Sequence, residues 1–192
     1  MITLLALALA FIVGSVPTGV IVARAKGVDL RKVGSGNIGA TNVGRALGKK
    51  WAIFVLAADA GKGALPVLLF GHFFASPWLP AMGGLCAVLG QVFSIFLRGR
   101  GGKGVATSLG AGLALAPLPA LGCVSVFAVF FFSFRIASIG SLIGVVSFPL
   151  FLWLFHLGTE PHLIFAVAVA VLVVARHKDN LMRLFRGEEH RA

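Results

Sequence analysis

The feature that most constrains this chain is a series of long apolar runs that contain no charged residue. The first, Ile2–Ala23, is 22 residues long, and another uncharged run extends from Gly104 to Phe134. A helix needs about 20 apolar residues to cross a bilayer. The runs are continuous and do not alternate in polarity, which favours helices over the strands of a barrel. The sequence therefore predicts an all-α, polytopic membrane protein.

The composition also argues against a soluble globular domain. Hydrophobic residues make up 58% of the 192 residues and charged residues only 12%, whereas a soluble domain is about half apolar and about a quarter charged. This length predicts one domain, residues 1–192. No Lys or Arg precedes the first apolar run, as it would in a secretory signal peptide. We therefore expect that run to be a membrane span.

Seven apolar segments are candidate spans. They are Ile2–Ala23, Trp51–Phe74, Trp78–Leu97, Val105–Ala116, Ala120–Phe134, Ile136–Leu157 and Pro161–Ala175. The fourth and fifth are short and are separated by a Pro-Leu-Pro break at residues 117–119, so one kinked helix is the alternative to two short ones. Basic residues can decide between these topologies, because Lys and Arg accumulate on the cytoplasmic side of a membrane.

With seven spans, sixteen of the 17 Lys and Arg residues fall on one side, and the exception, Lys62, lies within the second span. One kinked helix would move Arg135 and the basic tail to the opposite side. The sequence thus predicts seven transmembrane helices, with the N-terminus outside (periplasmic) and the C-terminus in the cytoplasm. Topology and anionic lipid headgroups then account for the net charge of +11. No nucleic-acid partner is predicted, because no recognition motif accompanies the charge.

The first predicted cytoplasmic segment, the first loop (residues 34–45), is rich in glycine and in side-chain donors. Glycines permit positive φ angles, and consecutive backbone N–H groups can form a nest for an anion. The polar side chains add further donors, and Arg45 adds a fixed charge. We expect a phosphate site here, and a flexible turn is the alternative. The predicted binding residues are Ser35, Gly36, Asn37, Gly39, Thr41 and Asn42, beside Arg45.

The second loop (residues 98–104) places Lys103 among Gly101, Gly102 and Gly104, directly before an apolar run. It departs from the Walker A pattern, which requires Gly-Lys-Ser/Thr. A lysine in a glycine turn at a helix N-terminus nevertheless suits an anion. The alternative is an ordinary positively charged loop, which would need no ligand.

The third segment (residues 176–183) begins where the last predicted span leaves the membrane. On a continuing helix, His177 and Asn180 would share one face because they are three residues apart. Considered alone, this is a weak signal, because an interfacial polar residue is the simpler reading. Arg176 and Arg183 add positive charge to the same segment.

The second span contains two ionisable residues, Asp59 and Lys62, three positions apart. Charges inside a membrane are costly and are usually paired, so we expect a helix-internal ion pair with either a structural or a catalytic role. Cys86 and Cys123 lie in apolar spans and are expected to be packing residues. No cysteine motif or metal spacing is present, so neither a metal nor a cofactor is predicted.

Taken together, these segments resemble the bacterial acyl-phosphate:glycerol-3-phosphate acyltransferase family over nearly the whole chain. The first loop is similar to the family's first motif, residues 101–107 to its second, and residues 176–184 to its third. The chain departs from the family pattern at Asp179, where glutamate is commoner, and at three positions before the second motif. Gln91 stands where histidine is usual, Ser94 where proline is common, and Gly99 where an aromatic residue is common. We interpret Gln91 as a supporting residue, since an amide can hydrogen-bond but cannot titrate near neutral pH.

The resemblance implies transfer of a fatty acyl group from acyl phosphate to glycerol-3-phosphate, giving 1-acyl-glycerol-3-phosphate and phosphate without a metal. This is the first acylation of phospholipid synthesis, and it is expected at the cytoplasmic face of the bacterial inner membrane. The first loop would hold a phosphate, that of the acyl donor. Glycerol-3-phosphate and the developing negative charge would be held by Arg45 together with Lys103, His177 and Asn180. The residues assigned catalytic roles are Ser35, Arg45, Lys103, His177 and Asn180, and those assigned to substrate binding include Gly36, Asn37, Gly39, Thr41, Asn42, Gly101, Gly102, Gly104 and Arg176.

Two other functions remain open from the sequence. A transporter of phosphate or organophosphate anions would also need cationic loops, although no clear internal repeat of the kind common in transporters is found. A metal-dependent headgroup transferase would need clustered carboxylates, and the chain has only six acidic residues. The proton acceptor is also open, because either His177 or a substrate phosphate could take the hydroxyl proton.

Overall fold

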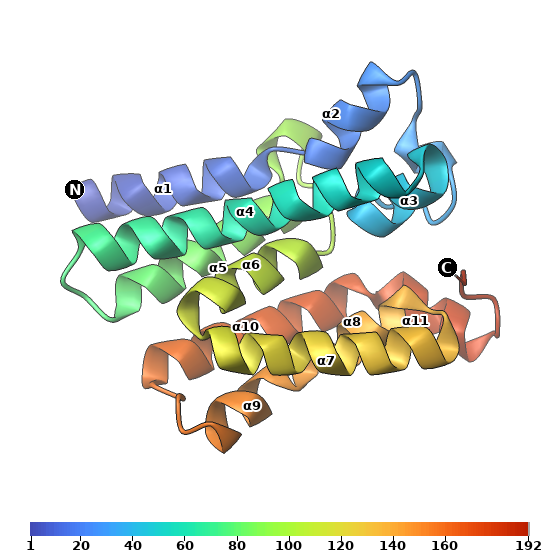
Figure 1. The fold of residues 1–192 in the computed structure, drawn as a ribbon. Helices are drawn as coiled ribbons and strands as arrows, with labels where there is room; N and C mark the ends of the chain where they lie inside the picture. Colours follow the sequence, from blue (N-terminus) through green and yellow to red (C-terminus); the bar gives the residue numbers. More distant parts are fainter. Residues whose placement is uncertain (192) are drawn as a thin grey trace.

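The computed structural model describes residues 1–191, and these residues form helices and connecting loops with no β-strand (Figure 1). The α-helices are α1 Ile2–Ser15, α2 Thr18–Ala25, α3 Ala40–Leu47, α4 Lys49–Phe73, α5 Trp78–Val92, α6 Val105–Leu115, α7 Pro117–Phe134, α8 Ala137–Val146, α9 Phe148–Leu154, α10 Glu160–Arg176 and α11 Lys178–Phe185. Two short 3-10 turns are η1 Leu30–Lys32 and η2 Ile95–Leu97. The all-α prediction is confirmed.

Four helical segments are long and apolar enough to cross a membrane: Ile2–Ala25, Lys49–Phe73, Trp78–Leu97 and Pro117–Phe134. Counting the bent pairs α8–α9 (42°) and α10–α11 (57°) as single spans raises the number to six. The remaining predicted span is the exception. Helix α6 has 11 residues, about 16 Å at roughly 1.5 Å per residue, which is near half of a hydrocarbon core of about 30 Å. It ends where Pro117 begins α7.

The first span is broken between α1 and α2. Proline has no backbone N–H and clashes with the preceding turn, so α1 ends at Ser15 and the chain resumes its helix at Thr18, after Pro17. The break frees the carbonyl of Val16, which accepts a hydrogen bond of 2.6 Å from Lys62 Nζ. The second span thus holds the first at its kink.

Glycines allow α6 to lie directly against α4. A Cβ at Gly63 would come within 1.9 Å of the Thr107 carbonyl oxygen, and one at Gly110 within 1.8 Å of the Ala60 carbonyl oxygen. Small residues permit this close approach between membrane helices. The contact fixes the start of α6, and with it the position of the second loop.

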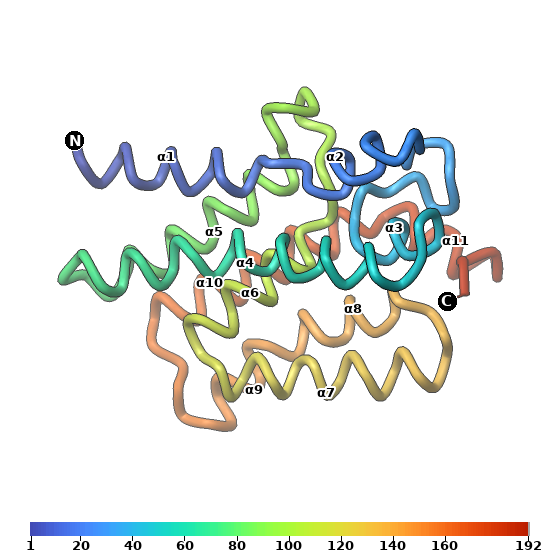
Figure 2. The backbone as a smooth tube through the Cα atoms, turned by 45° about the horizontal axis from the view of Figure 1, so that its top comes forward, coloured from blue at the N-terminus to red at the C-terminus, as the bar shows by residue number. Residues whose placement is uncertain are grey.

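The helices form two groups with α6 between them, as both views show (Figures 1 and 2). The N-terminal group contains α1, α4 and α5, and the C-terminal group contains α7, α8 and α9. The outward faces of the helices carry exposed large apolar side chains, such as Leu4, Phe132 and Val171, as expected for contact with lipid. The α7–α8 turn, α3 and α11 lie at the end of the bundle nearest the C-terminus, opposite the N-terminus (Figure 1).

Candidate active site

One cavity of about 560 Å³ joins all three of the predicted segments. Ser35 of the first loop, Lys103 of the second and His177 of the third all line it. Ten of the predicted site residues line this cavity: Ser35, Asn37, Gly39, Thr41, Asn42, Arg45, Lys103, Gly104, His177 and Asn180. Segments far apart in the sequence therefore meet at one place, as the motif pattern predicted.

The cavity is polar at one end and apolar over the rest of its length. Its apolar part is lined by α7 and α8, including Cys123, Phe127 and Val145. Ile53 on α4 and Val124 on α7 line the cavity and are also exposed. The apolar part therefore opens toward the lipid-facing surface, where an acyl chain could enter from the side.

Asn42 shapes the first loop from within. The side chain is buried, and its Nδ2 lies 2.8 Å from the Asn37 carbonyl, 2.9 Å from that of Val33 and 3.2 Å from that of Leu30. Its Oδ1 accepts a hydrogen bond of 3.0 Å from the backbone N–H of Ser35. The amide is therefore committed to the backbone. It positions the loop, whereas the sequence had suggested that it binds phosphate directly.

Arg31 ties the first loop to the second. Its Nη1 donates to the Gly36 carbonyl at 3.4 Å, and its Nη2 donates to the carbonyl of Arg100. In the sequence, Arg31 is only one of the basic residues that indicate topology. Gly36 itself does not line the cavity and has a positive φ of 67°, so it serves the turn of the loop.

The second loop is anchored to the end of α5. The N–H groups of Gly101 and Gly102 donate to the carbonyls of Val92 (3.0 Å) and Gln91 (2.9 Å). A Cβ at Gly101 would lie 2.1 Å from the Gln91 carbonyl oxygen. These two glycines therefore hold the loop in place and do not line the cavity, in contrast to their predicted role in binding.

Lys103 extends from this anchored loop into the cavity, where its Nζ donates to Asn180 Oδ1. Burial lowers the pKa of Lys103 to about 8; Arg183 and Arg45 lower it as well, whereas Glu189 and Asp179 raise it. The ammonium is therefore protonated at neutral pH, and it is partly stripped of water. Such a group is well suited to pair with a phosphate.

His177 lies at the 57° bend between α10 and α11, so the continuous helix considered for this segment does not form. Its Nδ1 is 2.7 Å from the Val173 carbonyl oxygen. A carbonyl can only accept, so Nδ1 carries the proton and Nε2 keeps a free lone pair. Burial, followed by the charge of Lys103, lowers the pKa of His177 to about 4. The imidazole is therefore neutral at physiological pH.

Arg176 does not line the cavity, although the sequence assigned it to substrate binding. Its Nε is buried without a hydrogen-bond partner, and its charge lowers the pKa of Arg31, for which burial is the larger cause. Helix α10 ends at Arg176, and the bend that follows directs His177 into the cavity and leaves Arg176 outside it.

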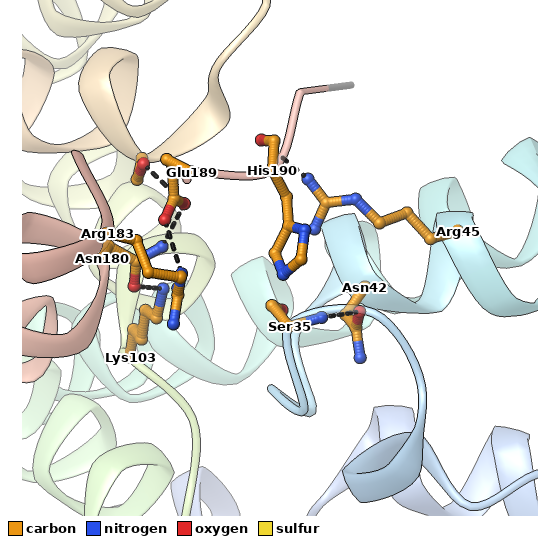
Figure 3. A network of polar contacts seen from close by, with 9 residues as sticks. Ser35, Asn42, Arg45, Lys103, Asn180, Arg183, Glu189 and His190 are labelled. Carbon is orange, nitrogen blue, oxygen red and sulfur yellow. Dashed lines mark hydrogen bonds and ion pairs between the residues drawn. The ribbon is translucent and has the colours of Figure 1, made fainter. Parts of the chain in front are cut away.

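Three residues at the polar end were missing from the predicted site: Ser138 on α8, Arg183 on α11, and Glu189 beyond it. Ser138 Oγ donates to Glu189 Oε1 (3.0 Å), and Arg183 Nε donates to Oε2 (2.8 Å). Figure 3 shows Glu189, Arg183, Asn180 and Lys103 together, facing Ser35 and Arg45. The sequence places Arg183 in the third segment without assigning it a role, whereas no local pattern marks Ser138 or Glu189.

The predicted ion pair within α4 is confirmed, with Lys62 Nζ 2.8 Å from Asp59 Oδ1. Gln91 completes the cluster, since its Oε1 accepts from Lys62 Nζ (2.6 Å) and its Nε2 donates to Asp59 Oδ2 (3.3 Å). Both Asp59 and Gln91 lie in the cavity wall. Gln91 is thus a supporting residue of a buried ion pair, and an amide fills this role without titrating.

Across residues 1–191 no group of three or more His, Cys, Asp or Glu side chains is arranged to hold a metal ion. The polar end instead holds Lys103 and Arg183 near the carboxylate of Glu189, with Arg45 across from them (Figure 3). Fold and site together define a multi-pass helical membrane protein with a cationic pocket that continues into an apolar, laterally open groove. Such a site fits molecules that combine a phosphate with an acyl chain.

Comparison with known proteins identifies the family. The glycerol-3-phosphate acyltransferase family matches residues 4–187. A glycerol-3-phosphate acyltransferase from Geobacter sulfurreducens is 46% identical over 186 residues, covering 96% of this chain and 94% of the relative. One from Aquifex aeolicus is 42% identical, covering 95% of each.

Two solved structures have the same fold. The crystal structure of PlsY, an integral membrane glycerol 3-phosphate acyltransferase, in its glycerol 3-phosphate form matches with a TM-score of 0.95 and 40% identity, covering 100% of this chain and 96% of that one. Its lysophosphatidic acid form gives 0.91 and 39%, with 100% and 95% covered. The chain belongs to the glycerol-3-phosphate acyltransferase family. It is a membrane acyltransferase of phospholipid biosynthesis, as the resemblance implied.

Proposed function

We propose that this enzyme takes its acyl group from acyl phosphate and transfers it to glycerol-3-phosphate, releasing 1-acyl-glycerol-3-phosphate and phosphate. The observation that carries the proposal is the single cavity, which joins a cationic end to an apolar groove open toward lipid. Acyl phosphate needs both parts, because it has a phosphate directly attached to a fatty acyl chain. It carries no large carrier group, so a cavity of about 560 Å³ can enclose its reacting end.

The two phosphates occupy different parts of the polar end. Glycerol-3-phosphate is held by the cationic and amide side chains Arg45, Lys103, His177 and Asn180. The phosphate of the acyl donor lies against the first loop, where Ser35, Asn37, Gly39 and Thr41 line the cavity. This arrangement directs the donor's acyl chain into the groove between α7 and α8 and brings its carbonyl beside the acceptor hydroxyl.

The reaction is a direct displacement that needs no nucleophile from the enzyme. The oxygen of the 1-hydroxyl attacks the carbonyl carbon, the bond from that carbon to the phosphate oxygen breaks, and phosphate leaves. Lys103 stabilises the negative charge that develops, and the fixed loops hold the reactants in position.

The proton of the hydroxyl goes to a substrate phosphate. His177, with a pKa of about 4, is a weaker base than a phosphate monoester, whose second pKa is about 6. Its free Nε2 can accept the hydroxyl's hydrogen bond and orient it. In a His177→Ala variant we expect a moderate loss of rate with an unchanged pH profile, whereas loss of one limb of that profile would identify His177 as the base.

The orientation follows from the positive-inside rule. The basic loops and the C-terminus face the cytoplasm, where glycerol-3-phosphate is available, and the N-terminus lies outside, in a bacterial inner membrane. An odd number of crossings is supported by the position of the two termini at opposite ends of the bundle (Figure 1). We propose seven, with the short helix α6 as the fourth crossing and α7 as the fifth.

The decisive experiment presents purified protein with glycerol-3-phosphate and one of three donors: acyl phosphate, acyl-CoA or acyl carrier protein. Only acyl phosphate should yield lysophosphatidic acid, and excess chelator should not reduce the rate. Equal activity with acyl-CoA would refute the proposed donor. Counterflow of phosphate in proteoliposomes without acylated product would favour a transporter instead.

A further inference from the structure

The carboxylate of Glu189 is held at the polar end of the cavity by three side chains from two helices. Its side chain is only 5% exposed, although it lies close to the C-terminus. Oε1 accepts from Ser138 Oγ of α8 and from Asn180 Nδ2 of α11, and Oε2 accepts from Arg183 Nε, also of α11. Burial alone would raise the pKa of Glu189, but the hydrogen bonds from Asn180, Arg183 and Ser138 lower it below its ordinary value.

We propose that Glu189 is a positioning residue for the acyl transfer, which orients Asn180 and Arg183 and thereby sets the position and charge of Lys103. The inference rests on the proposed placement of glycerol-3-phosphate at Lys103. It adds a residue that lies behind the groups in contact with the substrate (Figure 3).

The orientation of the Asn180 amide is the first link. An amide has one donating and one accepting end. Because Nδ2 donates to Glu189, Oδ1 faces the opposite way and accepts from Lys103 Nζ. Without the carboxylate, either end of the amide could face Lys103, and an NH₂ group there would repel the ammonium. Glu189 therefore selects the rotamer that holds Lys103.

Charge is the second link. Several charged groups act on Lys103: Glu189 and Asp179 are the acids, while Arg183 and Arg45 are the cations, with neutral His177 beside them. Among the acids, Glu189 has the larger effect in keeping Lys103 protonated. Removing this carboxylate leaves two arginines beside the ammonium, so Lys103 should lose its proton at a lower pH.

The hydrogen bonds distinguish this role from that of an inhibitory carboxylate that occupies the phosphate site, which we call a plug. Both oxygens of Glu189 are bound by Ser138, Asn180 and Arg183, and Lys103 bonds to Asn180 instead. The carboxylate thus lies one residue behind the lysine. A plug should bind the substrate-contacting cation directly and should slow the reaction when it is present.

The test compares Glu189→Gln with Glu188→Gln, which removes the same charge from the exposed neighbouring residue. The rate with varied glycerol-3-phosphate is measured from pH 6 to 9.5, and binding is followed by the thermal protection that glycerol-3-phosphate gives. For Glu189→Gln we expect kcat/KM to fall by roughly 100-fold, the size associated with a displaced catalytic group. We also expect its alkaline limb to move to lower pH. Glu188→Gln should match the wild type in both respects.

Wild-type kcat/KM and an unmoved alkaline limb in Glu189→Gln would overturn the inference, and a higher kcat/KM would show a plug. If Glu189→Gln does not fold, Glu189→Asp decides: it keeps the charge but has a shorter reach. A lower rate with an unmoved alkaline limb supports positioning, and a wild-type rate contradicts it. Failure of the wild type to bind glycerol-3-phosphate would sink the proposed substrate site. Normal binding together with a wild-type rate in the Glu189 variants would sink only the role of Glu189.

Discussion

Replacement of Asn42 tests whether this residue builds the first loop or contacts substrate. Its four backbone contacts, at 2.8 to 3.2 Å, are made by two N–H groups and one oxygen, and so amount to about three hydrogen bonds. At about 1 kcal/mol each, Asn42→Ala should destabilise the loop by about 3 kcal/mol. That is a large share of a typical stability of about 5–15 kcal/mol. We expect the loop to lose its shape while the helices stay assembled.

The isosteric variant Asn42→Asp makes the test sharper. A carboxylate has the same shape but cannot donate, and it would oppose the carbonyls of Leu30, Val33 and Asn37. Both variants should therefore lose most activity and become more sensitive to proteolysis within residues 33–38, with unchanged helix content by circular dichroism. Wild-type activity and protease resistance in Asn42→Asp would show that the amide N–H groups of Asn42 do not hold the loop.

Three further predictions follow from the same geometry. Gly110→Ala should prevent folding, since its Cβ would lie 1.8 Å from the Ala60 carbonyl, whereas Gly61→Ala has open space and should keep wild-type yield and activity. The wild-type rate should fall as pH rises through about 8, where Lys103 loses its proton. Lys103→Arg, which stays charged, should lack that fall even if it is slower. Finally, the pKa of His177 is about 4 in the folded protein. As pH drops below about 6.5, this imidazole therefore takes up a proton in the unfolded protein before it does so in the folded protein. Stability should decrease by about 3 kcal/mol between pH 6.5 and 4, and His177→Asn should reduce this loss in thermal melts; equal losses in both proteins would contradict the assignment.

The meeting of the three segments could be predicted because membrane topology limits where loops can lie. Once the apolar runs are taken as spans, the loops that are rich in Lys and Arg must emerge on the same side of the membrane. Among these loops, the ones rich in glycine and hydrogen-bond donors are candidates for a binding site. The ion pair of Asp59 and Lys62 was predictable for a related reason, since an unpaired charge in lipid is too costly.

The remaining features depend on tertiary contacts that no local pattern encodes. The short length of α6 is set by the proline that begins α7 and by glycine contacts with α4. The bend after α10 determines that His177, and not Arg176, faces the cavity. Glu189 reaches the site only because the chain folds back beyond α11, where the Glu188 N–H donates to the Arg183 carbonyl at 2.8 Å.

We propose that the phosphate of glycerol-3-phosphate binds at Lys103, where the second loop and the third segment meet. Solid-state NMR can measure this directly, using lysine labelled with ¹⁵N at Nζ and the ³¹P of bound glycerol-3-phosphate in a lipid-reconstituted sample. A charge-assisted contact puts nitrogen and phosphorus within about 4 Å, so a dipolar coupling should be observed in the wild type and be absent from Lys103→Arg. Saturated binding without that coupling, or a coupling that persists in Lys103→Arg, would contradict the account.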